Sequence, residues 1–437
     1  MGAIKSIALI GIGGYGAMYR SAFSDPALKK YPLTAIVDPN PPGAKILASL
    51  LEAKTLVFSS LDQLFKITGI DLAIVAAPIQ FHSLHTIALL RAGSHVLCEK
   101  PLCSTLEEAA DLLRERDKSG KQVTIGYQWS FSNAIQSLKA DYLQGVFGKA
   151  RRLRTIVLWP RNEMYYKRND WAGAVLDGQG RTVYDSPVHN ACAHFLHNML
   201  YVLGESPDRS AAPARVIAET YRGYEIDNYD TAVIRCHTAT GAEILFVASH
   251  AAGGGKGPTF CYEFENAMVH YDPDSDGTIT AKFSDGKRKS YGSPEESHYR
   301  KLFSAIEAAE MGTLPLCGIE AALPQVQVMV ATQRSRQQVV KFPDSLVTWH
   351  GEPTARSINV KGLDPVLQRC FETGLLPSEL GIAWAIPGRE IEIDPMDRLP
   401  TTTAEPSTPR IQPVKLAVTT HLKKRPGVKT SEEMGSH

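Results

Sequence analysis

The sequence predicts an α/β fold, with a doubly wound parallel sheet at the N-terminus and then an α+β domain whose open sheet is mostly antiparallel. Three observations support this prediction. Apolar runs alternate with helix-like segments up to residue 127, a glycine-rich turn follows the first run, and alternating strands joined by short turns dominate after about residue 210. Strands that alternate with helices of this length form parallel sheets through right-handed crossovers.

The glycine-rich turn follows the apolar run from Ile7 to Ile10 and reads Gly11-Ile12-Gly13-Gly14-Tyr15-Gly16, a G-x-G-x-x-G pattern. Its first glycine allows a tight turn, the second lets backbone N–H groups approach a pyrophosphate, and the third lets the next helix pack closely. The second apolar run ends in Asp38, about 20 residues after the turn. A carboxylate there accepts hydrogen bonds from an adenosine ribose and repels a 2′-phosphate, so we expect a Rossmann domain that binds NAD.

Further strands and helices alternate through the rest of this domain, and turn residues punctuate them. Pro78 stops one strand, Thr105 is placed to cap a helix, and Gly93 and Gly120 follow helix ends. We expect helices over 15–25, 42–53, 60–66, 81–92 and 105–118, and strands over 33–38, 57–58, 71–77, 95–98 and 122–127.

The second part of the chain has hairpin patterns. The turn at 238–241 joins two alternating strands, and Ser284-Asp285-Gly286 supplies another turn. Periodicity fades after about residue 345, and the chain from about 396 is rich in Thr, Pro and Lys. Residues 134–144 begin this second unit. We expect strands over 215–220, 230–237, 242–250, 260–271 and 278–283, and helices over 297–311, 319–338 and 364–374.

The length of 437 residues allows about two to three domains, and 43% of the residues are hydrophobic. The patterns divide the chain into an NAD-binding domain over 1–127, an α+β domain over 128–344, a C-terminal extension over 345–395 and a flexible tail over 396–437.

Composition argues against several other functions. The net charge is +1, which gives no reason to expect nucleic acid or a membrane surface as a partner. The seven cysteines form no C-x-x-C pair, so we expect neither a metal site nor a disulfide framework, in keeping with a reducing compartment. No apolar run reaches membrane-spanning length, and the first strand begins at once, so we expect a cytoplasmic protein.

Three further stretches bear polar residues at places where chemistry is expected. Ala77-Pro78 leads to His82, and Glu99-Lys100-Pro101 follows another strand; both lie at the carboxyl ends of strands, where ligands bind in such sheets. His82 could equally be a helix-cap residue near the surface. In the third stretch, helical spacing would place four residues on one polar stripe: Asn190, His194, His197 and Tyr201. That stripe could face solvent, consist of satisfied core histidines, line a substrate cleft or, less favoured without carboxylates, hold a metal.

Together these motifs resemble the Gfo/Idh/MocA family of dinucleotide-dependent dehydrogenases, over roughly residues 4–340. The order and spacing of the glycine turn, Asp38, the Pro78/His82 segment, Glu99-Lys100-Pro101 and His194 match that family. The resemblance implies an NAD-dependent oxidoreductase that transfers a hydride from a hydroxyl-bearing carbon of a sugar, cyclic polyol or sugar derivative. It also implies a homo-oligomer, dimer or tetramer, formed through the open sheet.

Three positions depart from the family pattern. Asn190 stands where relatives carry the catalytic Asp, Ile79 replaces a frequent Asn, and His197 occupies a position that is often Asp. An asparagine cannot carry the negative charge that would raise the pKa of His194. His194 would then depend on Asp185 or Tyr184, or it would be a poorer base.

The candidate roles follow from the resemblance and the chemistry of hydride transfer, which needs a base on the hydroxyl. We assign His194 as proton acceptor, Lys100 as the group that holds the hydroxyl oxygen, and Asn190 as a substrate contact or orienting residue. The aromatic stretch before His194, including Tyr165, is of the kind that stacks on sugar rings. The cofactor candidates are Gly11, Ile12, Gly13, Gly14, Tyr15, Gly16, Asp38, Ala77, Pro78, His82, Glu99, Lys100 and Gln128. The substrate candidates are Tyr127, Arg161, Tyr166, Trp171, Asp185, Asn190, His194 and His197.

Two other functions remain open from the sequence. One is an NAD-dependent glycosidase or lyase, which oxidises a hydroxyl transiently, eliminates a group and recycles its NAD. The other is a non-catalytic NAD-binding protein, in which Asn190 marks a lost activity. Net cofactor turnover distinguishes the first alternative from a dehydrogenase.

Overall fold

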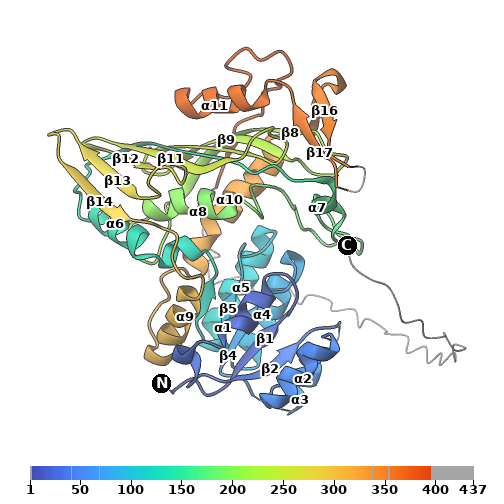
Figure 1. Cartoon of the computed structure of the whole chain (residues 1–437). Helices are drawn as coiled ribbons and strands as arrows, with labels where there is room; N and C mark the ends of the chain where they lie inside the picture. Colours follow the sequence, from blue (N-terminus) through green and yellow to red (C-terminus); the bar gives the residue numbers. More distant parts are fainter. Residues whose placement is uncertain (1, 41, 68, 337, 353–354, 395–437) are drawn as a thin grey trace, which may run out of the picture. The chain divides into compact units, whose positions relative to one another are not determined.

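The computed structural model describes residues 2–394 except 41, 68, 337 and 353–354. The tail expected over 396–437 lies outside the described residues. The N-terminal half contains a six-stranded, wholly parallel sheet in the order β3-β2-β1-β4-β5-β6, which confirms the doubly wound fold (Figure 1). Its strands are β1 Ile7–Ile10, β2 Leu33–Val37, β3 Leu56–Phe58, β4 Leu72–Val75, β5 His95–Cys98 and β6 Val123–Ile125.

Helices connect these strands as the alternating pattern predicts. Helix α5 is the best defined by its sequence: Thr105 Oγ1 accepts from Glu108 N–H at 3.2 Å, Glu108 accepts from Thr105 N–H at 3.1 Å, and Gly120 ends the helix at φ 65°. Such reciprocal capping satisfies amides that the first helical turn leaves unpaired. The helices of this half are α1 Gly16–Ala22, α2 Ala44–Glu52, α3 Leu61–Ile67, α4 His82–Arg91 and α5 Leu106–Ser119.

The second half contains a large mixed sheet in the order β14-β13-β12-β11-β7-β10-β9-β8-β15, with β18 paired to β8. Most neighbours are antiparallel, as predicted, but β10 pairs parallel with β7. Strand β7 has no counterpart in the sequence prediction, and the single strand expected over 260–271 is two strands. The strands are β7 Ala150–Leu158, β8 Pro213–Arg222, β9 Thr231–Thr238, β10 Glu243–Ser249, β11 Lys256–Phe264, β12 Ala267–Tyr271, β13 Ile279–Phe283, β14 Arg288–Gly292, β15 Val340–Lys341 and β18 Ile391–Glu392.

Helices cover one face of this sheet. Helix α8 contacts β7, α10 contacts β8, and α6 contacts β14. Helix α9 instead returns to the first sheet, where Leu302 and Ile306 join an apolar cluster with Ile7 and Leu9 of β1. The helices are α6 Asn133–Leu143, α7 Glu163–Lys167, α8 Ala193–Val202, α9 Arg300–Met311 and α10 Ile319–Ser335.

Strand β10 shows that both faces of the large sheet are buried. Ile244 and Phe246 belong to the core shared with α8 and α10, whereas Leu245 and Val247 belong to a second cluster. Successive side chains of a strand point to opposite faces, so this alternation requires a covering layer on the other side.

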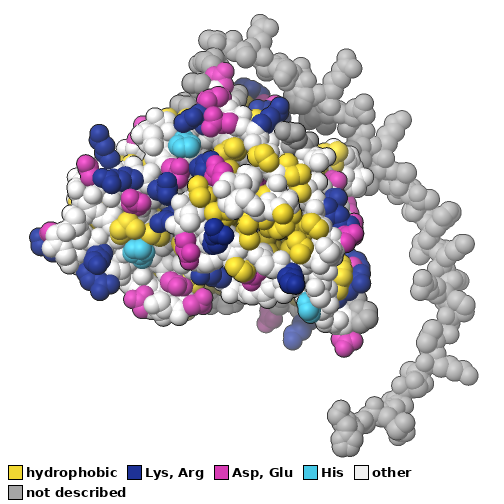
Figure 2. Space-filling model, turned by 90° about the horizontal axis from the view of Figure 1, so that it is seen from above, with side chains coloured by type: hydrophobic (Ala, Val, Ile, Leu, Met, Phe, Trp, Pro, Cys, Tyr) yellow, Lys and Arg dark blue, Asp and Glu magenta, His cyan; other side chains and the backbone are white. Residues whose placement is uncertain are grey.

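The covering layer is the C-terminal extension. Helix α11 Leu363–Thr373 packs on β7 and β10, and a small hairpin of β16 Val347–His350 and β17 Ser357–Val360 precedes it. In Figure 1, α11 lies on the side of the sheet opposite α8 and α10. Figure 2 views this side and shows apolar side chains gathered among charged ones. The helix expected over 364–374 is confirmed, while the hairpin had no periodic signal.

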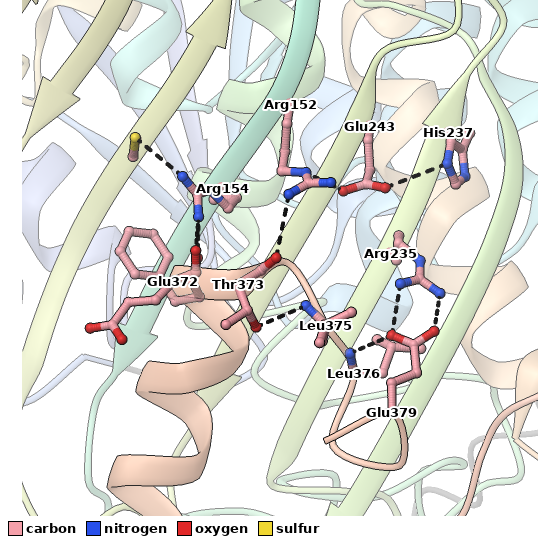
Figure 3. Close-up of polar contacts among 12 residues, drawn as sticks. Arg152, Arg154, Arg235, His237, Glu243, Glu372, Thr373, Leu375, Leu376 and Glu379 are labelled. Atoms are coloured by element: carbon pink, nitrogen blue, oxygen red, sulfur yellow. Dashed lines mark hydrogen bonds and ion pairs between the residues drawn. The ribbon is translucent and has the colours of Figure 1, made fainter. Parts of the chain in front are cut away.

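Arginines of the sheet fasten the extension (Figure 3). Arg235 makes two bonds to the Glu379 carboxylate, at 2.8 and 2.5 Å. Arg154 donates to the carbonyl oxygens of Phe371, at 3.0 Å, and of Glu372, while Arg152 donates to Thr373 O at 3.3 Å. The middle of the sheet face that we expected to be available for oligomerisation is therefore occupied by the chain itself.

Candidate active site

The glycine-rich turn lies at the carboxyl end of β1 and has the geometry that its sequence predicts. Gly11 has φ +86°, and a Cβ there would lie 2.9 Å from Ala76 O; a Cβ on Gly16 would lie 2.1 Å from Gly11 O. Only glycine fits either position. At Gly13 a Cβ would meet nothing within 4 Å, so the turn is open where a pyrophosphate would approach.

Asp38 lies beside this turn, at the end of β2. One carboxylate oxygen accepts from the N–H of Ile12 and the other from the N–H of Asn40, both at 2.9 Å. The residues predicted to hold the two ends of an adenosine diphosphate moiety are thus brought together. The open glycine turn and the neighbouring carboxylate therefore fit the pyrophosphate and the ribose of a dinucleotide.

Tyr15 and Glu99 are tied to α9 by a residue that the sequence did not reveal. Lys301 Nζ lies 2.5 Å from Glu99 Oε1 and 3.1 Å from Tyr15 Oη, and Glu99 also accepts from Tyr19 at 2.5 Å. Glu99 is buried, so it holds the turn and α9 together inside the protein. Burial lowers the pKa of Lys301, although Glu99 opposes that shift.

His82 is buried, which corrects the alternative of a cap near the surface. Its Nδ1 lies 2.7 Å from Pro101 O and its Nε2 lies 2.9 Å from Ala77 O. Burial lowers its pKa, and the two carbonyl contacts oppose that shift. His82 thus joins the loop after β4 to the loop that carries Lys100.

Lys100 and Asn190 come from different halves of the chain and meet at the carboxyl edge of the parallel sheet. Lys100 Nζ donates to Asn190 O at 2.8 Å and lies 3.4 Å from its Oδ1. Asn190 Nδ2 donates to Asp185 Oδ1 at 2.7 Å, and Asp185 Oδ2 accepts from Gly173 N–H at 2.6 Å. Position 190 thus bears an amide, and the nearest carboxylate in this chain of contacts is that of Asp185, one side chain further from Lys100.

This arrangement perturbs both ionisable groups. Burial, the largest cause, lowers the pKa of Lys100 to about 8, although the nearby Glu99 opposes it. Burial also raises the pKa of Asp185, while the N–H of Gly173 and the charge of Arg168 oppose that rise. An amine with such a pKa can exchange a proton near neutral pH.

His194 lies in the first turn of α8, with its ring edge-on to Tyr127 at 5.7 Å between ring centres. Burial holds its pKa well below the usual range, and Lys100 and Lys301 lower it further. Its Nδ1 is buried without a hydrogen-bond partner among the described residues. The lowered pKa favours the neutral imidazole, and no hydrogen bond to Nδ1 from the described residues orients the ring.

Two of the four residues of the expected polar stripe are closed to a ligand: His197 and Tyr201 are buried, whereas Asn190 and His194 are half-buried. The helix begins at Ala193, so Asn190 lies in the preceding turn. His197 is buried, stacks on Tyr127 at 3.9 Å between ring centres, and has Nε2 2.9 Å from Ser130 Oγ. Tyr127 is also buried and donates to Gln325 at 3.1 Å. His197 and Tyr127 thus lie within the core and do not face a cleft.

The aromatic stretch before α8 does gather beside Asp185. Arg161 and Arg168 lie 5.0 and 3.7 Å from the centre of the Tyr165 ring, and Arg168 is also 5.2 Å from that of Trp171. Tyr166 Oη lies 3.1 Å from His250 Nδ1. Gln128 begins a short 3-10 helix, Gln128–Phe131, after β6.

Three residues near these groups were not singled out from the sequence: Lys301, Arg168 and His189. His189 is buried, and neither ring nitrogen has a hydrogen-bond partner among the described residues. Lys301 comes from a helix of ordinary amphipathic pattern, which carries no local sign of a partner 202 residues away. Arg168 lies in the predicted aromatic stretch, where its neighbouring rings were the available signal.

Comparison with known proteins agrees with this arrangement. The family model for the Gfo/Idh/MocA oxidoreductases, described as "Oxidoreductase family, NAD-binding Rossmann fold", matches residues 5–127. Glucose-6-phosphate 3-dehydrogenase of Bacillus subtilis (strain 168) is 28% identical over 145 residues, which are 33% of this chain and 40% of that protein. The 2,7-anhydro-N-acetylneuraminate hydratase of Escherichia coli (strain K12) is 25% identical over 206 residues, 46% of this chain and 50% of that protein. The chain thus spans half or less of the length of these relatives.

A solved structure extends the likeness in fold beyond the first domain. The WlbA dehydrogenase from Bordetella pertussis, solved with NADH and UDP-GlcNAcA, has a TM-score of 0.62 at 20% identity, covering 76% of this chain and 96% of that one. Its identity is low, so it bears on the fold alone. The first domain of this chain, over residues 5–127, thus matches the family model of the Gfo/Idh/MocA oxidoreductases.

Proposed function

We propose that this protein is an NAD-dependent dehydrogenase that oxidises a hydroxyl-bearing carbon of a sugar, cyclic polyol or sugar derivative. The observation that carries the proposal is the contact of Lys100 with Asn190, 2.8 Å from Nζ to the backbone oxygen. It joins the loop after β5, in the domain of the glycine turn, to the turn before α8. An ionisable group with a shifted pKa at such a junction is a candidate for proton transfer.

NAD would be held by the turn from Gly11 to Gly16, which is open at Gly13 for its phosphates, and by Asp38. The carboxylate of Asp38 would accept hydrogen bonds from the ribose. Bound there, it would supply a hydride acceptor at its nicotinamide ring. His82 and Glu99 would act by holding the loops that shape the site, and Ala77 and Pro78 would line it.

For the proton, the electrostatics favour exchanging the two roles assigned from the sequence. The pKa of His194 is held well below its usual range by burial, which makes this imidazole a weak base. The pKa of Lys100, about 8, is matched to neutral conditions. Lys100 is therefore the proposed proton acceptor, and neutral His194 a hydrogen-bond partner of the substrate.

This assignment predicts the pH dependence of oxidation. The neutral amine is the base, and it is populated above its pKa, so kcat/KM is expected to rise with pH through about 8. A charged Lys100 that only held the hydroxyl oxygen would give the opposite sign, with activity falling through that range. Steady-state kinetics from pH 6 to 10 distinguish the two.

The Asn190→Asp variant tests the chain from Asp185 to Lys100. Asn190 Nδ2 and Asp185 Oδ1 lie 2.7 Å apart, so two carboxyl groups there would share a proton and place negative charge beside Lys100. The pKa of Lys100 is then expected to rise, moving the rise of kcat/KM to higher pH. If Asn190 instead donates to the substrate, KM increases and the profile stays in place.

The preference for NAD is tested at Asp38. In Asp38→Asn the amide oxygen can still accept from the Ile12 N–H, which keeps the turn, but the charge that repels a 2′-phosphate is lost. Calorimetric titration is expected to show NAD bound about 10-fold or more tighter than NADP by the wild type, with this ratio reduced in the variant. Tighter binding of NADP by the wild type would contradict the proposal.

A redox-assisted elimination or hydration is the second candidate, because one relative is named as a hydratase. Such a reaction recycles its NAD within each turnover. Product formation without accumulation of NADH would identify it. A non-catalytic NAD-binding protein would instead give no product with any carbohydrate.

A further inference from the structure

We propose that the carbohydrate substrate carries an anionic group, a carboxylate or a phosphate, and that Arg161 and Arg168 bind it. This inference rests on the proposed function and specifies its substrate class. We call these two guanidinium groups and the rings of Tyr165 and Trp171 the arginine cluster.

Both guanidinium groups of the arginine cluster contact the ring of Tyr165. Arg161 lies 5.0 Å from the centre of the Tyr165 ring and 5.7 Å from that of Trp159, while Arg168 lies 3.7 Å from Tyr165. Contacts of this kind hold a guanidinium in place without neutralising it. Both arginines are therefore positioned but retain their positive charge.

Negative charge around these arginines is scarce. Asp185 is the carboxylate paired with Arg168, at a long 4.0 Å, and its oxygens already accept from Gly173 and Asn190. The neighbouring Glu163 is engaged by Lys167 and Arg356. The Nε of Arg161 is buried and has no hydrogen-bond partner among the described residues.

The pKa shifts of nearby groups also reflect the charge of both arginines. The pKa of Tyr165 is raised to about 12, by burial first and then by Asp185, and the two arginines oppose that rise. Burial, the largest cause, holds the pKa of His250 well below its usual range, and the same two arginines lower it further. A bound anion would compensate the positive charge of both guanidinium groups.

The arginine cluster is also placed to serve the reaction. Arg168 contacts Asp185, which is bonded to Asn190, which is bonded to Lys100. Burial raises the pKa of the Cys192 thiol to about 12, and Arg161 and Lys100 both oppose that rise; this thiol lies between Asn190 and His194 in the chain. A guanidinium matches the oxygens of a carboxylate or phosphate through paired hydrogen bonds, and flanking aromatic rings suit a sugar.

The test compares anionic sugars with their neutral parents on the NAD-loaded full chain. D-glucuronate, D-galacturonate and D-glucose 6-phosphate would be titrated by calorimetry beside D-glucose and D-galactose. We expect at least one anionic probe to bind about 10-fold or more tighter than its parent, because charge-assisted hydrogen bonds are added. The uronates and the sugar phosphate distinguish a carboxylate from a phosphate.

Two variants and a control sharpen the result. Arg161→Gln and Arg168→Gln are each expected to lose most of the preference for the anionic probe over its parent sugar. Arg91→Gln is the matched control, because Arg91 pairs with Glu115 outside this cluster, and it should behave as wild type. Circular dichroism and melting curves check that each variant folds.

Each outcome decides between the proposals. If no anionic probe binds more tightly than its parent, or if the arginine variants weaken both alike, the inference is overturned. If a neutral sugar then reduces NAD in a manner that depends on Lys100, the proposed function stands without it. If no probe is oxidised, the dehydrogenase proposal fails. The ratio of affinities for the anionic and neutral probes still tests the role of the arginine cluster.

Discussion

Replacement of Lys100 by alanine is expected to lower turnover by about 100-fold or more, as the loss of a positioned proton-transfer group does. The side chain reaches from the loop after β5 to Asn190, and burial lowers its pKa to about 8. Among the described residues no other amine is placed to replace it, since the neighbouring Lys301 is engaged by Glu99 at 2.5 Å. The loss should therefore fall on kcat, with the affinity for NAD largely retained.

Two further variants serve as controls for this measurement. Lys100→Met keeps the length of the side chain and removes only the amine, so it separates lost chemistry from lost packing. Lys149→Ala changes an exposed lysine and should leave kcat as in the wild type. A folded Lys100→Met protein with near wild-type turnover would show that Lys100 is not part of the chemistry.

The second large effect is expected at Leu367, in the middle of α11. This side chain is wholly buried in the cluster that joins the extension to Leu245 and Val247 of the sheet. Leu367→Ala is expected to lower the free energy of unfolding by about 2–5 kcal/mol, because it leaves a cavity. Leu367→Asp should cost more, since it buries a carboxylate that has no counter-charge among its apolar neighbours.

Urea unfolding measures both changes. Val366→Ala, on the adjacent half-buried position, is the control and should lose less. Light scattering adds a readout of assembly: with its face covered, the wild type should not associate through Leu245 and Val247, whereas Leu367→Asp exposes them and should self-associate. Equal losses for Leu367→Ala and Val366→Ala would mean that α11 contributes little to the fold.

Much of the first domain could be predicted because its signals are local. Glycine is required at 11 and 16 because a Cβ there would clash with neighbouring backbone atoms, Asp38 follows the second strand, and Thr105 caps its helix. Parallel strands present their carboxyl ends at one edge of a sheet. Strand order alone therefore brings the glycine turn, Asp38 and Lys100 to the same edge.

Other features arise from contacts between residues far apart in the chain, which leave no periodic pattern. The pairing of β7 with β10, the cover that the extension gives to the sheet, and the ion pair of Lys301 with Glu99 are of this kind. The extension shows the reason most plainly: the hairpin before α11 and the segment around Glu379 are ordered by the sheet beneath them, and Arg235 has no local partner in sequence.

The sequence by itself determined the Rossmann domain and the candidate cofactor residues. It also placed Lys100 in the first domain and His194 in the second, because spacing and strand order encode these features. Only the tertiary structure decided that Asn190 precedes its helix and bonds Asp185, that His197 and Tyr127 lie in the core, and that Arg168 joins Arg161. Burial and pKa depend on what surrounds a side chain in space, and its neighbours in sequence supply only part of those surroundings.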